Sequence, residues 1–311
     1  MQKDRTYFLA GIIISVTGAL CFSSKAIFVK LGYQDNQTDV LTLLAVRMMG
    51  ALPFFTISSV VALSNRENRK KLNARNLIQI IIIGFLGYYI ASFLDFAGLQ
   101  YVSAGLERLI LFVYPTLVLL MSWQFFGQQI SRNQWLAVAI TYCGIILAFA
   151  GEYNLTDSFN NQAGDQLLTG SILILGCALA YAGYIVGSSR LIPKTGASLF
   201  NSLSMVAASI GILFHFFVFS NSDLQQITTQ AWKYGLLMAV FATVIPSYLI
   251  AESIKRIGGE NTAIIASIGP VSTILMAYRW LGEPITIWQI LGTVCILAGV
   301  WMISARGKKT E

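Results

Sequence analysis

Five charged side chains of this sequence lie inside long apolar runs, namely Lys25, Arg47, Asp95, Glu107 and Arg108. An unpaired charge at the centre of a membrane-spanning helix costs on the order of 3 kcal/mol. Three cations and two acids in the first half of the chain therefore predict a cluster of paired charges. Two functions fit such a cluster: a network that holds helices together, or an outer gate or anchor for a charged substrate group.

The pairing within this cluster follows from helix geometry. Adjacent residues of a helix point about 100° apart, so Glu107 and Arg108 face different neighbours. We expect Arg108 to pair with Asp95 on the preceding helix and Glu107 to face another element. Near the end of a later run, Glu252 is expected to pair with Lys255 or Arg256 at the membrane surface.

Uncharged polar and aromatic side chains follow single faces of the same runs, as Tyr88, Ser92 and Asp95 do at i, i+4 and i+7. Lipid penalises polar groups, so such faces line a cavity or pack against neighbouring helices. Tyrosine is also typical of membrane interfaces, which leaves both functions open. The candidate substrate-binding residues are Lys25, Tyr88, Ser92, Asp95, Glu107, Tyr114, Tyr181, Tyr184 and Ser247.

Residue patterns of catalysis and metal binding are missing from the sequence. The single histidine, His215, excludes a site built from histidines, and no H-E-x-x-H or G-x-S-x-G pattern occurs. No phosphate-binding G-x-x-x-x-G-K-[ST] loop is present either. We expect no catalytic residue, no metal, no cofactor and no ATP-driven step. Four cysteines lie in apolar runs without C-x-x-C spacing and are expected to pack as small residues: Cys21, Cys143, Cys177 and Cys295.

The composition identifies the solvent of this chain as the lipid bilayer. Of 311 residues, 56% are apolar and 11% charged, with a mean hydropathy of +0.67. A soluble domain contains about 25% charged residues. Spanning the hydrocarbon takes roughly 20 helical residues. The sequence contains ten such apolar runs, at 7–30, 39–64, 76–100, 103–126, 132–150, 167–191, 197–219, 230–254, 261–281 and 285–304.

Positive charges predict the orientation of these spans. Of the 21 lysines and arginines, 15 lie at one alternate set of helix ends. The opposite connections, 31–38, 151–166 and 220–229, contain acids but no lysine or arginine. Cytoplasmic loops carry the excess of positive residues. Both termini are therefore expected in the cytoplasm, which requires an even number of spans in the cytoplasmic membrane.

The two halves of the chain are related by an internal repeat. At an offset of 155 residues, identical pairs include Pro115 and Pro270, Gly127 and Gly282, Gln134 and Gln289, and Gly144 and Gly299. Five helices in each half make the second half enter the membrane in the opposite sense. We expect an all-α integral membrane fold: a first repeat at 1–151, an outer linker at 152–166, a second, inverted repeat at 167–306 and a cytoplasmic tail at 307–311.

Among the prolines within the expected spans, the candidate gating or hinge residues are Pro115, Pro246 and Pro270. Each removes a backbone donor and bends its helix. Since Pro115 and Pro270 are related by the repeat, they are candidate hinges on which the two halves rock, or static bends accommodated by packing. The repeat-related Gly144 and Gly299 predict tight packing between the fifth and tenth helices.

The sequence resembles the EamA family of the drug/metabolite transporter superfamily. The resemblance rests on four segments: Phe22-Ser23-Ser24 through Lys30, the stretch 104–110, Tyr114-Pro115-Thr116 and Gly282-Glu283-Pro284. It implies ten helices in two five-helix repeats, with six of them around a central pathway. Phe22, Ser23 and Gln128 stand where the family usually has Trp, Gly and Glu, so the resemblance implies the fold and not the substrate.

Together these features predict a secondary transporter, not an enzyme, that moves small polar or amphipathic metabolites such as amino acids by alternating access. Export is the favoured direction. Its partners would be the small-molecule substrate and the lipid bilayer, with a homodimer left open and nucleic acid excluded. The alternatives are a membrane sensor or scaffold without transport, and an intramembrane lipid-handling enzyme.

Overall fold

The computed structural model of this protein describes residues 2–35, 37–155, 161–220 and 224–304. Within these residues every regular element is a helix. The expected tail 307–311 and the middle of the expected linker 152–166 lie outside the described residues. An all-helical fold satisfies each backbone N–H and C=O within its own segment, as a lipid environment requires.

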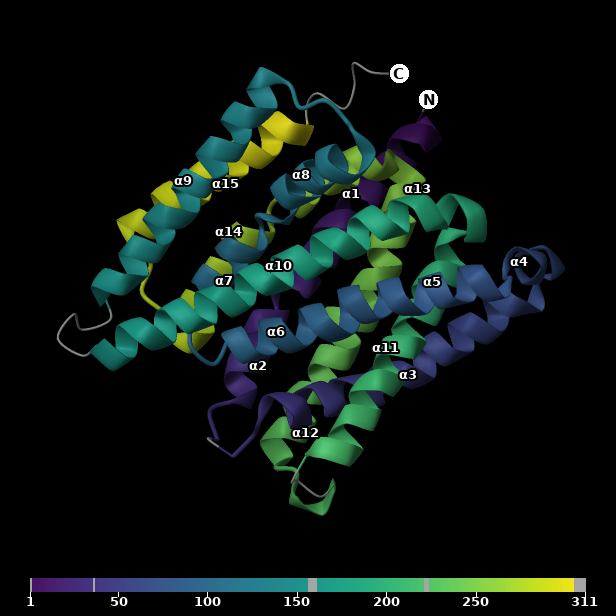
Figure 1. Cartoon of the computed structure of the whole chain (residues 1–311), viewed down its shortest axis with the longest axis horizontal. Coiled ribbons are helices and arrows are strands. Elements are labelled where there is room, and N and C mark those ends of the chain that lie inside the picture. The colour runs from purple at the N-terminus through teal and green to yellow at the C-terminus, as the bar shows by residue number, and fades with distance from the viewer. Residues whose placement is uncertain (1, 36, 156–160, 221–223, 305–311) are drawn as a thin grey trace.

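The first half of the chain contains α1 to α9, and two of its membrane-crossing units are interrupted helices (Figure 1). The α1 and α2 helices are separated only by Ser24. The bounds are α1 Gln2–Ser23, α2 Lys25–Gly32, α3 Val40–Ser64, α4 Arg66–Lys71, α5 Ala74–Gly84, the π-helix η1 Phe85–Ile90, α6 Ala91–Gly98, α7 Ala104–Leu111, α8 Tyr114–Phe126 and α9 Arg132–Leu155.

The second half of the chain continues from α10 to α15. Its elements are α10 Asn161–Thr195, α11 Ala197–Phe219, the short 3-10 helix η2 Leu224–Gln226, α12 Thr229–Ala239, the π-helix η3 Val240–Val244, α13 Ile245–Ala266, α14 Gly269–Met276, the π-helix η4 Ala277–Leu281 and α15 Ile287–Ser304.

Eight stretches of the described residues form helices long and apolar enough to cross a membrane. They correspond to the first eight expected runs. The tenth run appears as α15, whose apolar part, Ile287–Met302, is shorter than the others. The ninth differs from expectation, because α13 does not end at 254 but continues to Ala266, and the chain breaks at 267–268 instead. Pro270 has no N–H to continue the helix and its ring clashes with the carbonyl group four residues earlier, which is that of Ala266, so α13 ends there.

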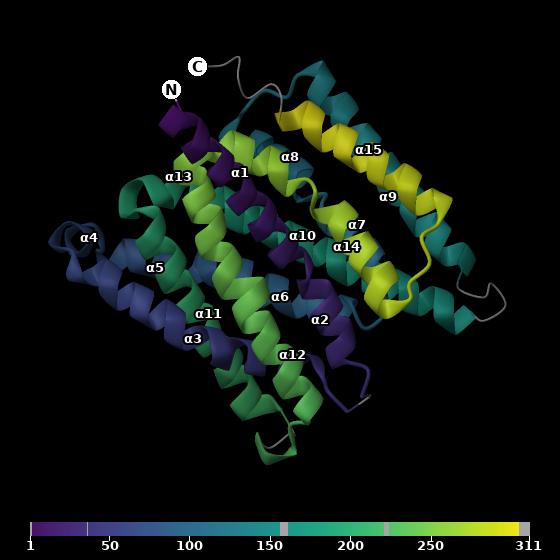
Figure 2. The same ribbon diagram turned by 180° about the vertical axis from the view of Figure 1, so that it is seen from behind.

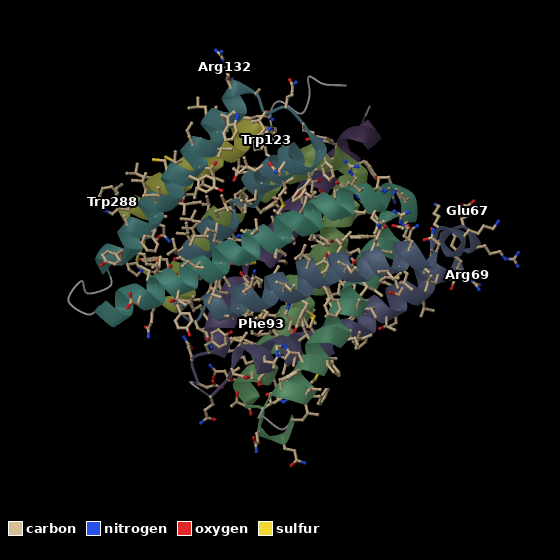
Figure 3. The ribbon with its side chains drawn as sticks, viewed as in Figure 1. Glu67, Arg69, Phe93, Trp123, Arg132 and Trp288 are labelled. Atoms are coloured by element: carbon tan, nitrogen blue, oxygen red, sulfur yellow. The ribbon has the colours of Figure 1, made fainter. Side chains whose placement is uncertain are left out.

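The connections lie along two opposite edges of the molecule (Figures 1 and 2). The beginning of α1, the short α4 and the end of α15 lie along one edge, and the α2–α3 and α11–α12 connections along the other. Figure 3 shows Glu67 and Arg69 on α4 and Arg132 at the start of α9 at the margin of the molecule. Between the edges large apolar side chains face outward, among them Phe125 and Phe219, each 69% exposed. Such a surface is suited to lipid.

Two helix breaks occur at positions related by the repeat. Residues 112–113 form a turn before α8, and residues 267–268 form a turn before α14. Pro115 and Pro270 occupy the second position of the helices that follow. A proline is tolerated there because the N–H that it lacks has no partner in the first turn. The expected bends thus take the form of complete breaks.

Further local features recur at the same offset of 155 residues. The π-helices η1 and η3 begin at Phe85 and Val240, and Pro246 follows directly after η3. Gly127 and Gly282 both end a helix in the left-handed region, with φ of 65° and 70°. Only glycine adopts this conformation without strain.

The α9 and α15 helices pack closely against each other, as the glycines of both predict. A Cβ atom added at Gly144 would lie 2.7 Å from the carbonyl oxygen of Gly292, and one added at Gly292 would lie 2.6 Å from that of Gly144. Gly299 likewise faces Thr141 and the carbonyl oxygen of Ala137. The predicted tight packing is confirmed, and it lies within one chain.

Gly144→Ala and Gly292→Ala should each lower the free energy of unfolding by about 1–3 kcal/mol, because the added methyl group meets backbone that cannot move aside. Gly176→Ala on α10 is the matched control, since its Cβ would meet only the tip of Leu94 at 3.3 Å. Thermal unfolding in detergent measures the difference. Equal midpoints for Gly144→Ala and Gly176→Ala would contradict this account of the contact.

Candidate functional site

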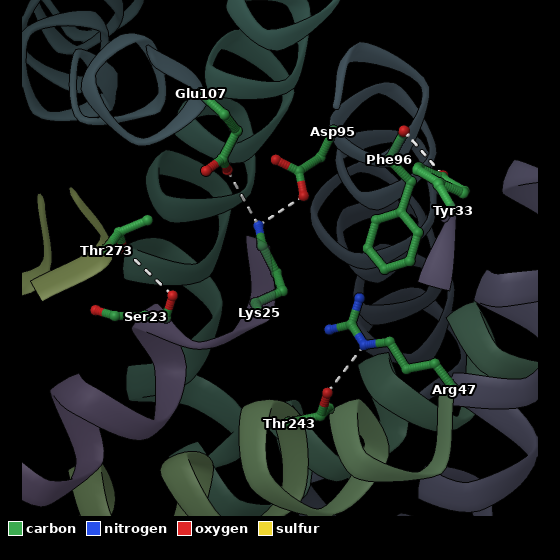
Figure 4. Close-up of polar contacts among 9 residues, drawn as sticks. All are labelled: Ser23, Lys25, Tyr33, Arg47, Asp95, Phe96, Glu107, Thr243 and Thr273. Carbon is green, nitrogen blue, oxygen red and sulfur yellow. Dashed lines mark hydrogen bonds and ion pairs between the residues drawn. The ribbon is translucent and has the colours of Figure 1, made fainter. Parts of the chain in front are cut away.

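Lys25 lies between two buried carboxylates (Figure 4). Its Nζ is 2.6 Å from Asp95 Oδ2 and 3.5 Å from Glu107 Oε1. Lys25 is the first residue of α2, Asp95 is on α6 and Glu107 is on α7. The ion pairs therefore join three helices at one nitrogen. We call Lys25, Asp95 and Glu107 the charge triad.

The charge triad is almost completely withdrawn from the surface. Asp95 is 1% exposed and Glu107 is not exposed at all. Apart from the contacts with Lys25, no donor among the described residues forms a hydrogen bond with the four carboxylate oxygens of these two residues. Buried acceptors are normally satisfied. The triad is therefore an exception, with carboxylate oxygens left unsatisfied in the part of the chain that the structure describes.

The expected ion pair between Arg108 and Asp95 is wrong. Lys25 takes that position, and no ion pair joins the described Arg108 to a described carboxylate. The Arg108 guanidinium lies 5.2 Å from the centre of the Phe22 ring and against Gly269, the first residue of α14. The buried Nε of Arg108 has no hydrogen-bond partner. On α7, Glu107 and Arg108 do face different neighbours, as helix geometry predicts.

Arg47 on α3 supplies a third cation beside the triad. Its Nε donates a hydrogen bond of 2.9 Å to Thr243 Oγ1 on η3, and its guanidinium lies 5.5 Å from the centre of the Phe96 ring. Figure 4 shows this guanidinium pointing into the interior between Phe96 and Thr243. Arg47 is 5% exposed, and its Nη1 has no hydrogen-bond partner. It links the two halves of the chain.

Neutral contacts of α1 with the second half complete this region. The hydroxyl of Thr273 on α14 donates a 3.2 Å hydrogen bond to the carbonyl oxygen of Ser23 (Figure 4). The hydroxyl of Ser23 donates a 3.3 Å hydrogen bond to the carbonyl oxygen of Gly269. These contacts hold the break between α1 and α2 against the break before α14. Two interrupted helices thus meet beside the charges.

Four tyrosines predicted for the site form one continuous group. The hydroxyls of Tyr88 and Tyr184 are 3.0 Å apart, and Tyr88 donates a 2.8 Å hydrogen bond to Asn201 Oδ1. Tyr181 stacks on Tyr184 at 5.8 Å, and Tyr114 meets Tyr181 edge-on at 5.1 Å between ring centres. The polar and aromatic helix faces predicted from the sequence were expected to line a cavity or to pack between helices. In the structure these four tyrosines pack against one another as a continuous row of aromatic rings.

The two predicted serines lie apart from these interactions. The hydroxyl of Ser247 donates a 2.7 Å hydrogen bond to the carbonyl oxygen of Val244 in its own helix. Ser92 is half-buried on α6. Glu252 forms the expected surface pair, with Arg256 Nε at 2.7 Å and Lys255 Nζ at 3.9 Å.

Two glutamates cap the first turn of α7 at the predicted outer edge. Glu283 accepts hydrogen bonds from the backbone N–H groups of Ala104 at 2.9 Å and Gly105 at 3.3 Å. Glu152 accepts from the N–H of Ser103 at 2.7 Å and from its hydroxyl at 2.5 Å. Carboxylates are favoured there by the exposed N–H groups and the helix dipole. The Glu283 contact joins the second half of the chain to the first.

A second contact between the halves lies in the same outer region. Asp35 Oδ2 accepts hydrogen bonds from the hydroxyls of Thr228 at 2.5 Å and Thr38 at 2.8 Å. Burial raises the pKa of Asp35, but these bonds and those from the N–H groups of Gln37 and Thr38 lower it by more, so the pKa lies below its ordinary value. Asp35 therefore stays ionised at neutral pH and ties the α2–α3 connection to the start of α12.

Two residues of this region, Asn201 and Glu283, were not among the candidates from the sequence. Asn201 is a single neutral residue within an apolar run, and nothing in the spacing of α11 distinguishes it from a packing residue. Thr243 shares a polar helix face with Ser247 at i and i+4, but this spacing does not identify Arg47 as its partner. Glu283 carried a signal, since its Gly282-Glu283-Pro284 turn was part of the family resemblance. Glu283 accepts a hydrogen bond from Gly105 at the start of α7, which is 178 residues earlier in the chain. This contact could not be inferred from the local sequence.

Comparison with protein families gives one match across the chain. The model of the EamA-like transporter family matches residues 9–150 and, a second time, residues 168–305. The two matches fall on the two halves separated by the expected linker.

Relatives of similar length carry transporter names. The chain is 30% identical over 287 residues to a Bacillus subtilis protein named Uncharacterized transporter YcbK, covering 91% of this chain and 89% of that one. It is 21% identical to an uncharacterized transporter of Methanothermobacter thermautotrophicus, covering 96% and 88%. A solved crystal structure aligns over 96% of this chain and 99% of its own, with a TM-score of 0.61 at 15% identity, which shows the fold alone.

Lys25→Met should lower the free energy of unfolding by about 3–5 kcal/mol, because it leaves two buried carboxylates without their cation. The triple variant Lys25→Met, Asp95→Asn, Glu107→Gln removes all three charges and should recover most of that loss. Thermal unfolding in detergent, followed by size-exclusion chromatography, compares the two. A single variant as stable as the triple variant would show that Lys25 does not compensate the acids.

Proposed function

This chain belongs to the EamA-like transporter family, and from that premise we propose that it is a secondary transporter of small polar or amphipathic metabolites such as amino acids. It moves them across the cytoplasmic membrane by alternating access, with export as the direction. Two five-helix units, 1–151 and 167–306, form an inverted repeat of ten helices joined by the outer linker 152–166. Both termini face the cytoplasm.

The observation that carries this proposal is the set of unused donors and acceptors where the two halves of the chain meet. The carboxylate oxygens of Asp95 and Glu107 are acceptors for an ammonium group. Arg108 Nε and Arg47 Nη1 are free donors for a carboxylate. Both kinds of group are present in an amino acid, and charge-assisted hydrogen bonds fix the orientation of such a ligand.

Aromatic packing supports the amphipathic part of the substrate class. The ring of Tyr114, the first residue of α8, lies 5.1 Å from the ring of Tyr181 on α10, next to Tyr184 of the same helix. Binding sites for small molecules are mostly apolar, with a few convergent polar groups. The tyrosines supply the apolar wall, and the charges supply the polar groups.

Alternating access is supported by the paired breaks and by the contacts at one edge. The breaks at 112–113 and 267–268 are related by the repeat, and each lies next to a proline. Glu283 and Asp35 connect the two halves at the predicted outer edge. In transporters built from repeats, the halves rock around a site near the midplane. The described contacts correspond to closure on the outer side.

Reconstituted vesicles test the transport proposal directly. Vesicles loaded with a mixture of the twenty amino acids should accumulate at least one radiolabelled amino acid by counterflow when they contain the wild-type protein. The triple variant Lys25→Met, Asp95→Asn, Glu107→Gln keeps the helix packing but loses the three charges that would bind a charged substrate group, so its counterflow should fall to the level of empty vesicles. Absence of counterflow for every amino acid would contradict the proposed substrate class.

Glu283→Ala should open the outer side, because it removes the acceptor that ties the second half to α7. Val102→Cys, at a position 1% exposed, reports opening in a chain whose native cysteines are replaced by serine. Its labelling by a membrane-impermeant maleimide from the outer side should become severalfold faster. Glu152→Ala is the matched control, because Glu152 caps the same turn from within the first half. Equal labelling rates in the two variants would contradict a closure role for Glu283.

A further inference from the structure

We propose that Asp95 and Glu107 together hold one exchangeable proton beside Lys25, and that release of this proton is coupled to substrate binding. This inference rests on the transport function proposed above and deepens it by assigning the coupling ion and its site. The site is formed by α6 and α7 of the first half, with the ammonium group of α2 between them.

Two carboxylates compete for one ammonium nitrogen at ion-pair distance. Counted by these contacts alone, the triad with all groups ionised has one negative charge in excess. Arg47 and Arg108 attract Asp95 and Glu107 from a longer distance, but neither forms an ion pair with a described carboxylate. The excess charge is therefore only partly compensated, and one proton on the carboxylate pair makes the triad neutral.

The geometry of the unused oxygens also favours a shared proton. Lys25 contacts one oxygen of each carboxylate, and no donor among the described residues reaches the other two buried oxygens, Asp95 Oδ1 and Glu107 Oε2. Two carboxylates that share a buried site characteristically keep one proton between them. That proton turns one unsatisfied acceptor into a donor and satisfies part of the site.

The surroundings supply no competing titratable partner at hydrogen-bond distance. Cys177 of α10 and Tyr33 at the end of α2 are the uncharged titratable neighbours of the triad. The hydroxyl of Tyr33 is already used, since it donates a 3.0 Å hydrogen bond to the carbonyl oxygen of Phe96. The charged neighbours are Arg47 on α3 and Arg108 on α7, and both are turned toward aromatic rings.

A metal cation fits this site less well than a proton. Sites for hard cations use six or more oxygens. The described residues contain no group of three or more His, Cys, Asp or Glu side chains able to hold a metal ion. Lys25 also occupies the point between the two carboxylates where a cation would sit.

Coupling follows from competition for the same oxygens. When the ammonium group of a substrate binds Asp95 or Glu107, the shared proton leaves to water, and the ammonium group replaces the positive charge that the proton gave to the carboxylate pair. The negative charge of the substrate carboxylate is balanced by Arg47 or Arg108, which have unpaired donors among the described residues. When the substrate leaves on the other side, a proton from that side returns to the carboxylate. Each cycle exchanges one substrate for one proton.

Infrared spectroscopy of the lipid-reconstituted protein tests the site without any substrate. At neutral pH the wild type should show the carbonyl-stretch band of a buried protonated carboxylic acid, which disappears at alkaline pH. The triple variant Lys25→Met, Asp95→Asn, Glu107→Gln should lack this band and remain folded. Glu252→Gln, which removes a surface carboxylate, should keep it. A wild type without the band, or a triple variant with it, would overturn the proposal.

Counterflow under a pH gradient tests the coupling, with the mixture of twenty amino acids as the probe. Vesicles one pH unit more acidic inside should accumulate the transported amino acid up to about tenfold more than vesicles without a gradient, as one-to-one exchange requires. Wild-type flux that ignores the gradient would overturn the coupling. An infrared band without any counterflow would instead contradict the transport function and leave the proton site standing.

Discussion

The contact of one lysine with two carboxylates is the interaction on which the interior of this protein depends. Water outside a membrane would screen these charges, whereas hydrocarbon cannot, so each must find a partner within the chain. Lys25 meets this need for Asp95 and Glu107 at once. Because the three residues come from α2, α6 and α7, the ion pairs also determine how the first half of the chain packs around its centre.

The two halves of the chain contribute different chemistry to this centre. Among the described residues, the charged side chains that are fully buried all come from the first half. The second half contributes neutral groups. Thr243 accepts from Arg47, the carbonyl oxygen of Gly269 accepts from Ser23, and Thr273 donates to Ser23. A repeat-related scaffold therefore holds an asymmetric group of polar contacts. Buried polar networks are favourable only when their members are satisfied, and within the described residues several donors and acceptors of this network have no partner.

Much of the fold could be predicted from the sequence, because lipid leaves few choices. Long apolar runs had to be helices, and the first eight expected spans have counterparts in the structure. The cluster of buried charges was also predictable from the cost of isolated charges. Which of these charges pair with each other could not be predicted. Sequence periodicity shows only which residues share a helix face. Whether Lys25 or Arg108 is the partner of Asp95 depends on how α2 and α7 are placed in the fold. The bend at Pro270 was predicted, but the continuation of α13 to Ala266 was not, because the charged and glycine-containing segment 255–260 resembles a connection between two spans.

The glycine contact between α9 and α15 has a consequence for how the two halves can move. The carbonyl oxygens of Gly144 and Gly292 each lie where the other glycine would carry its Cβ, so backbone touches backbone. Sliding one helix along the other would bring larger side chains into this narrow gap. Rotation about the crossing point meets no such obstacle. In the alternating-access cycle proposed above, the last helix of each half would therefore form a pivot, around which the halves turn while they stay attached.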